Sequence, residues 1–87
     1  MPYVDQEARA YIELEGPYEI GDLNYAITKL LMAYMVEWGE CYVTYNDMIG
    51  ALECAKLELY RRMCAPYEDR KCMTNGDVYE IPPRKKL

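Results

Sequence analysis

The chain has 87 residues, an apolar content of 52% and a net charge of −5. This composition excludes a disordered chain, and the longest apolar run, Leu30 to Val36, is far too short for a membrane-spanning helix. A chain of this length buries roughly 60–65% of its extended surface, so we expect a single helical domain over residues 1–79 and a flexible basic tail over residues 80–87.

The first predicted helix covers residues 5–15. Asp5 can cap its first turn, Glu7 is an acidic residue suited to that turn, and Gly16-Pro17 ends it. About half of one face of this helix is apolar. The chain start lacks the basic and hydrophobic regions of a signal peptide, so we expect a cytoplasmic location.

A second, longer helix is predicted over residues 23–38, with Asp22 as its cap and Gly39 as its end. Its main apolar stripe follows the spacing of three and four residues that marks a buried helix face. The opposite side is also apolar, which is unusual for a surface helix of a monomer. We expect the main stripe to be core and the opposite side to contact a second subunit or a ligand. The stripe contains Leu23, Ile27, Leu30, Leu31, Tyr34 and Trp38, and the expected interface residues are Tyr25, Met32 and Val36.

The third helix is predicted over residues 47–64, after an extended, β-prone segment over residues 40–45. Asn46-Asp47 or Thr44 is the expected cap. At about 100° per residue, one side of this helix carries a charged residue, Lys56, in the middle of an apolar stripe. A buried lysine needs a compensating partner, which can be a residue of the same chain, a ligand or a second subunit. In angular order the side carries Leu59, Leu52, Met63, Lys56, Ile49, Tyr60 and Glu53.

Pro66 is expected to end the third helix and to start a fourth. Acidic residues precede basic ones over residues 67–72, which suits the helix dipole, and Asn75-Gly76 supplies an end. These elements predict an all-α fold: a compact helical hairpin with short flanking helices, three or four in total.

Several catalytic side chains are missing from the sequence. The chain has no histidine, the commonest general base near neutral pH, and no serine nucleophile. The four cysteines, Cys41, Cys54, Cys64 and Cys72, show no C-x-x-C spacing and have no histidine to complete a zinc site. We therefore expect a protein that is not an enzyme, with no cofactor, no metal site and reduced cysteines.

Charge is distributed unevenly along the chain. Residues 1–55 contain ten acidic and two basic residues and carry −8, whereas residues 56–87 contain eight basic and five acidic residues and carry +3. This asymmetry favours pairing within the chain, head-to-tail contact between subunits, or a basic pocket for an anion. The acidic part would oppose the phosphate backbone of a nucleic acid, so only the basic tail over residues 84–86 favours nucleic-acid binding.

Three blocks of the sequence, GDLNYAITKLL (21–31), YNDMIGALECAKLELYRR (45–62) and APYEDRKCMTNGDVY (65–79), resemble a family of small proteins encoded by tailed bacteriophages and prophages. The resemblance covers Gly21 to Tyr79, with the N-terminal stretch and the PPRKKL tail outside it. It implies a setting, the cytoplasm of an infected bacterium, and no particular reaction.

The same blocks contain arginine and lysine donors, tyrosine rings and an amide, which together suit a phosphate-bearing aromatic ligand. Alternatively, Glu53 and Lys56 form an ion pair that fixes helix packing, and Arg61 and Arg62 are surface residues that pair with Glu58, Glu68 or Asp69. No Gly-x-Gly phosphate loop is present. The candidate ligand-binding residues are Asn24, Tyr25, Glu53, Lys56, Tyr60, Arg61, Arg62, Tyr67 and Lys71.

Two functions follow from these observations. The first is a non-catalytic, homo-oligomeric binder that sequesters a small anionic nucleotide of the kind used in bacterial anti-phage signalling. The second is a protein–protein interaction module that binds and inhibits or modulates a host protein, since tyrosine is common among interface anchors. An enzyme and a nucleic-acid-binding protein rank below both.

Overall fold

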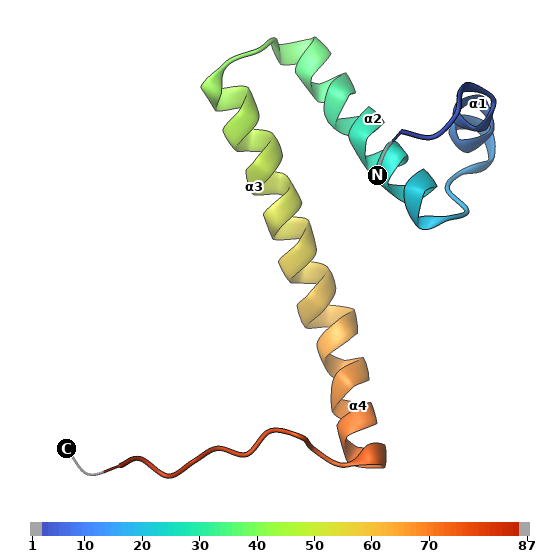
Figure 1. Ribbon diagram of the computed structural model, residues 1–87. Coiled ribbons are helices and arrows are strands. Elements are labelled where there is room, and N and C mark those ends of the chain that lie inside the picture. Colours follow the sequence, from blue (N-terminus) through green and yellow to red (C-terminus); the bar gives the residue numbers. More distant parts are fainter. Residues whose placement is uncertain (1–2, 86–87) are drawn as a thin grey trace. The chain divides into compact units, whose positions relative to one another are not determined.

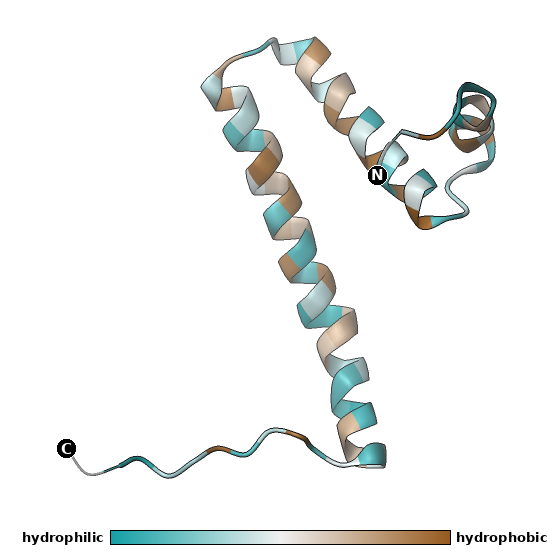
Figure 2. Cartoon of the chain, in the orientation of Figure 1, coloured by the Kyte–Doolittle hydropathy of each residue, from teal (hydrophilic) through white to brown (hydrophobic). Residues whose placement is uncertain are grey.

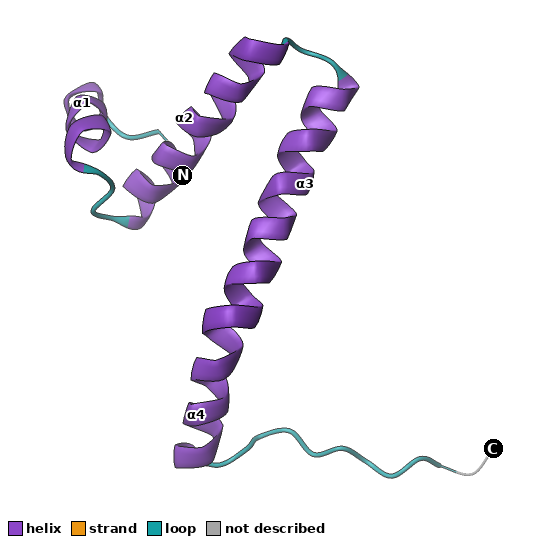
Figure 3. Cartoon of the chain, turned by 180° about the vertical axis from the view of Figure 1, so that it is seen from behind, coloured by secondary structure: helices purple, strands orange, loops and turns teal. Residues whose placement is uncertain are grey.

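The computed structural model describes residues 3–85, and this part of the chain is helical with no strand (Figures 1 and 3). The all-α prediction is confirmed. The chain divides into two units, Met1–Ile49 and Gly50–Leu87, with the boundary inside the third helix. The elements in order are α1 (Gln6–Glu15), α2 (Ile20–Trp38), α3 (Tyr42–Leu59), the π-helical turn η1 (Tyr60–Cys64) and α4 (Ala65–Asn75).

Helix α1 begins and ends where the sequence indicates. The Asp5 carboxylate accepts a hydrogen bond from the Ala8 amide at 2.9 Å, which satisfies one of the free donors of the first turn. Gly16 ends the helix with a φ of 91°, a conformation that side-chain-bearing residues rarely adopt.

Helix α2 begins three residues earlier than expected. Asp22 lies inside the first turn instead of capping it, and its carboxylate accepts from the backbone amides of Tyr18 at 3.1 Å and Glu19 at 3.2 Å. An acidic group at this third helical position reaches back to the amides before the helix. The helix therefore starts at Ile20.

The side chain of Tyr25, on α2, contacts residues of α1. Its ring is buried, with 7% of its surface exposed, and Ile12 of α1 is buried as well. Its hydroxyl donates to Glu13 Oε1 at 3.1 Å, and the Arg9 guanidinium lies 5.7 Å from the ring centre. Glu13 also lies 4.0 Å from the ammonium group of Lys29. Burial, followed by the bond to Glu13, raises the pKa of the Tyr25 hydroxyl.

The predicted core stripe of α2 is not buried as we expected. Five of its six residues are exposed and the sixth, Leu31, is half-buried, whereas Tyr25 on the other side is buried against α1. An apolar stripe identifies a face that can be covered but not the element that covers it. The exposed stripe residues are Leu23 (46% exposed), Ile27 (41%), Leu30 (75%), Tyr34 (38%) and Trp38 (68%).

Helix α3 begins at Tyr42, so the prediction of an extended segment over residues 40–45 is wrong for residues 42–45. Strand propensity is a weak and context-dependent signal. Thr44 does not cap the helix; it is buried inside the first turn, where its hydroxyl lies 3.3 Å from the Cys41 sulfur. Asp47, the other expected cap, instead accepts a hydrogen bond from the Tyr34 hydroxyl at 2.9 Å.

A fourth helix begins where we expected, with Pro66 in the first turn of α4, but the helical path is not interrupted there. Helix α3 passes through η1 directly into α4 (Figure 3), and the amide of Ala65 donates to the carbonyl of Tyr60, five residues back. In an ordinary α-helix the ring of Pro66 would collide with the carbonyl of Arg62. The wider π-helical turn accommodates this residue, because π-helical turns insert locally where the α-helical bonding pattern is interrupted.

The second unit has no core of its own. No described residue from Gly50 to Lys85 is buried, and only Cys64, Ala65, Pro66 and Cys72 are partly covered. Four residues of the described part are buried, and all belong to the first unit: Ile12, Tyr25, Thr44 and Met48. In Figure 2, apolar residues are interspersed with polar ones along helix α3.

The segment after α4 is irregular. Residues 76–85 form neither helix nor strand, and the last two residues of the tail predicted over residues 80–87 lie outside the described part. Within residues 3–85, no helix combines the length and the apolar character needed to cross a bilayer.

Candidate functional site

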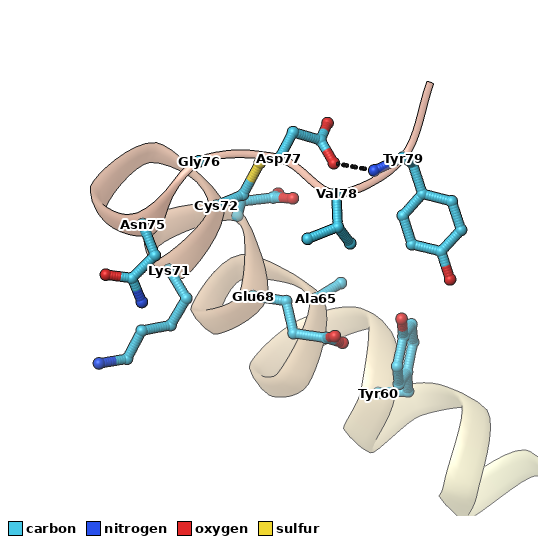
Figure 4. A pocket seen from close by; sticks show the side chains of 11 residues that line it. Tyr60, Ala65, Glu68, Lys71, Cys72, Asn75, Gly76, Asp77, Val78 and Tyr79 are labelled. Atoms are coloured by element: carbon cyan, nitrogen blue, oxygen red, sulfur yellow. Dashed lines mark hydrogen bonds between the residues drawn. The ribbon is translucent and has the colours of Figure 1, made fainter. Parts of the chain in front are cut away.

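An open groove of about 470 Å³ lies in the second unit, between the η1–α4 helix and the segment that follows it (Figure 4). Tyr60 comes from η1, and Glu68, Lys71 and Cys72 come from successive turns of α4. Val78 and Tyr79 come from the segment after α4. Its volume is within the range of small-molecule sites. The remaining lining residues are Ala65, Asp69, Asn75, Gly76 and Asp77.

Glu68 is the central hydrogen-bond acceptor of this groove. Its carboxylate accepts from the Cys64 thiol, with the sulfur 3.3 Å from Oε1. A second hydrogen bond, to Glu68, raises the pKa of the Tyr60 hydroxyl, and the bond from Cys64 raises the pKa of that thiol. A neighbouring carboxylate favours the neutral, proton-donating form of both groups. Glu68 therefore disfavours ionisation of both Tyr60 and Cys64.

The far wall of the groove depends on Gly76 and Asp77. Gly76 ends α4 with a φ of 91°, and Asp77 Oδ1 accepts from the amide of Tyr79 at 2.9 Å, a turn typical of aspartate. In Figure 4 this turn places Val78 and Tyr79 along the groove opposite Tyr60. Burial, followed by the charge of Asp77, raises the pKa of the Cys72 thiol, which also lines the groove.

The charge of the groove is unfavourable for an anion. Its lining contains three carboxylates, Glu68, Asp69 and Asp77, and one ammonium group, Lys71. Phosphate sites in proteins depend on arginine, lysine and free backbone amides. This groove is better suited to a neutral or cationic group than to a nucleotide phosphate.

The structure places two of the predicted ligand residues, Tyr60 and Lys71, in this groove. Tyr67 lies outside its lining, and its ring is approached by the cations of Arg70 at 5.8 Å and Lys71 at 5.6 Å. Such exposed cation–aromatic contacts contribute about 0.5–1 kcal/mol.

The charged residues of α3 and η1 pair with one another along the helix surface. Lys56 Nζ lies 3.2 Å from Glu53 Oε2, and both side chains are more than half exposed. Glu58 receives both arginines, with Arg61 Nη2 at 2.8 Å and Arg62 Nη1 at 3.6 Å. Exposed pairs of this kind contribute little to stability.

The remaining predicted residues belong to the first unit. Asn24 is exposed, and its backbone carbonyl accepts a hydrogen bond from the Thr28 hydroxyl at 2.9 Å. Tyr25 is buried against α1, whereas Met32 and Val36 are exposed by 46% and 81%. The predicted interface side of α2 therefore has one covered and two free positions.

Sequence reasoning did not include Cys72, Asp77, Val78 and Tyr79 in the site. The signal that could have indicated them is the Asn-Gly-Asp run over residues 75–77, which combines a helix end with a turn. Such a run predicts that the chain turns back beside the last helical turn.

The structure offers no cluster for a metal ion among residues 3–85, where no group of three or more cysteine, aspartate or glutamate side chains is suitably arranged. The four cysteines are free thiols. A hydrogen bond from the Thr44 hydroxyl, together with backbone amides at the start of α3, lowers the pKa of Cys41.

Comparison with known proteins identifies a family but no characterised relative. No curated protein and no solved structure matches the chain. The family match extends over residues 1–78, so the N-terminal stretch, which we expected to lie outside the resemblance, belongs to the family region. The chain is a member of the family described as a domain of unknown function, DUF6899.

Proposed function

We propose that this chain is a non-catalytic protein-binding module that presents helix α2 to an apolar groove of another protein. The observation that supports this most directly is the exposed apolar stripe of α2. Its five residues are separated by three or four positions and are each at least 38% exposed. The stripe residues are Leu23, Ile27, Leu30, Tyr34 and Trp38.

This arrangement fits a recurring mode of recognition, in which an amphipathic helix inserts anchors at positions i, i+3 or i+4, and i+7 into a hydrophobic groove. Trp38 and Tyr34 occupy the C-terminal end of the stripe, with ring centres 6.4 Å apart. Tryptophan and tyrosine are enriched among residues that dominate binding energy. We therefore expect this end of α2 to supply most of the affinity.

The charge of the first unit indicates the partner's chemistry. Residues 1–49 contain nine acidic and two basic residues, a net charge of −7. Acidic residues lie at both ends of α2, Glu19 and Asp22 at the start and Glu37 and Glu40 at the end. Complementary charge steers association, so the partner is expected to have lysine or arginine residues around its apolar groove.

The resemblance to phage and prophage proteins supports a host protein as the partner, and thus a role in modulating a bacterial process. Sequestration of an anionic nucleotide is the weaker proposal, because three carboxylates line the groove at Tyr60 and Lys71. Of the two functions considered from sequence, protein binding has the better structural support.

A matched pair of substitutions on α2 tests this proposal. Leu30 and Val36 are exposed by 75% and 81% and lie on opposite sides of the same helix. The wild-type chain is used to capture a bacterial protein, which is then purified and titrated against both variants. We expect Leu30→Glu to weaken binding by about thirtyfold or more, as for a central interface anchor, and Val36→Glu to have little effect.

The opposite ranking, with Val36→Glu as the damaging substitution, would assign binding to the other side of α2. Equal affinities of the two variants for the captured protein would contradict the proposal. Native mass spectrometry of the chain with a nucleotide pool tests sequestration separately: a retained nucleotide that is lost in Lys71→Ala would favour that function instead.

A further inference from the structure

The helix from Gly50 to Asn75 has to be stabilised by something outside its own unit. No residue in this stretch is buried, and helices in proteins obtain most of their stability from packing of an apolar face. Several large apolar side chains of the stretch are freely exposed, among them Leu59 (64%) and Met63 (67%). These side chains define a face that is available for association.

The face has the spacing of a helix-pairing seam. Ile49, Leu52, Lys56, Leu59 and Met63 are separated by three, four, three and four residues, the repeat that aligns side chains along one line of two supercoiled helices. Towards the start of α3 the same spacing continues through Tyr45 and Tyr42. Lys56 is the single charged residue in this series. A lone polar or charged residue in such a seam costs stability but specifies register and orientation.

We propose that two copies of this chain pair through this seam in antiparallel orientation. In a parallel pair, the ammonium groups of Lys56 from the two copies would face each other. In an antiparallel pair, Lys56 lies opposite Leu52 of the second copy and beside its Glu53. The arrangement is two-fold symmetric, so the contact forms twice. Within one helix the same two side chains form an ion pair, with Lys56 Nζ 3.2 Å from Glu53 Oε2.

Charge along the helical run supports the same orientation. Residues 42–55 contain two acidic residues, Asp47 and Glu53, and no basic residue, whereas residues 56–75 contain five basic and three acidic residues. Antiparallel pairing places the acidic part of one helix against the basic part of the other. The complementary pattern that the seam needs is present in this chain itself, so a second copy is the occupant that fits. The seam residues belong to α3 and η1, and none of them is part of the exposed stripe of α2.

Charge reversal tests the pairing. Lys56→Glu places two glutamates side by side across the seam, and Glu53→Lys places two lysines there. We expect each single variant to raise the dimer dissociation constant by about tenfold or more, measured by sedimentation over a concentration series. Lys71→Glu changes the charge by the same amount off the seam and serves as the matched control, which we expect to remain dimeric.

Mixing the two single variants separates contact between chains from contact within a chain. Each variant keeps its own like-charge clash inside its helix, so a restored dimer can only come from opposite charges across the seam. We expect native mass spectrometry of an equimolar mixture to show predominantly the mixed dimer. A wild-type chain that stays monomeric at its highest soluble concentration would overturn the proposal, as would dimers that are unaffected by either reversal.

Orientation is tested by cross-linking in full-length chains in which Cys41, Cys54, Cys64 and Cys72 are replaced by alanine. Antiparallel pairing brings position 49 of one copy opposite position 59 of the other. Ile49→Cys mixed with Leu59→Cys should therefore form a mixed disulfide under mild oxidation. Disulfides formed only between identical variants would show a parallel pair and contradict the proposed orientation.

Discussion

Both units of this chain are helical, but over residues 3–85 only the first contains buried side chains. In Met1–Ile49, helix α1 is held on α2 by Ile12, Tyr25 and the bond from Tyr25 to Glu13. In Gly50–Leu87, the interactions are local pairs along one helix and an open groove at its end. Equal helical content in the two units therefore does not mean equal packing: buried side chains stabilise the first unit, and we propose that the second obtains its stability from association.

The largest expected effect is the difference between deleting an apolar side chain in one unit and in the other. Ile12→Ala removes a side chain that is 4% exposed and should lower the free energy of unfolding by about 2–5 kcal/mol. Leu57→Ala removes the same number of carbons at a site that is 56% exposed, off the proposed seam, and should change it by no more than about 0.5 kcal/mol. Urea unfolding followed by circular dichroism measures both; similar losses would mean that the second unit has a core too.

Replacing two glycines by alanine is expected to change the free energy of unfolding by smaller amounts and in opposite directions. Gly16 has a φ of 91° at the end of α1, whereas Gly50 lies inside α3 with no atom near the position of an added methyl group. Gly16→Ala should lower the free energy of unfolding by about 1–3 kcal/mol, and Gly50→Ala should raise it by about 0.5–1 kcal/mol. If Gly50→Ala were instead destabilising, this position would be in close contact with another helix.

The smallest expected difference between the two units is in the reactivity of their cysteines. The hydroxyl of Thr44 lowers the pKa of Cys41 in the first unit, whereas the carboxylate of Glu68 raises that of Cys64 in the second. Because the thiolate is the reactive form, alkylation of Cys41 should begin at lower pH than alkylation of Cys64. Peptide mass spectrometry across a pH series measures both, and Glu68→Gln should shift the Cys64 profile to lower pH while leaving Cys41 unchanged. Identical profiles would contradict these assignments.

The parts of the fold that could be predicted from sequence are those fixed by local signals. Asp5 and Gly16 bound α1 correctly because a cap and a glycine end act within one turn. Tyr42 to Tyr45 was assigned wrongly because the strand propensity of such a short segment depends on its surroundings. Pro66 indicated a helix end, but the change to five-residue bonding at η1 depends on the whole helical path.

The candidate site was predicted less completely. Tyr60 and Lys71 lie on one continuous helix, and helical spacing alone could bring them near each other. Val78 and Tyr79 reach the groove only through the turn at Asp77, and no periodic pattern encodes that return. The exposure of the α2 stripe was also missed, because periodicity shows which side chains share a face and not what covers that face.

The most direct test of the central claim, that the second unit obtains its stability from association, is amide hydrogen exchange measured at high and low protein concentration. We predict that amides of residues 50–75 lose protection on dilution while those of α1 and α2 keep theirs, because only the second unit depends on a second copy. Protection of residues 50–75 that does not change with concentration would contradict this claim.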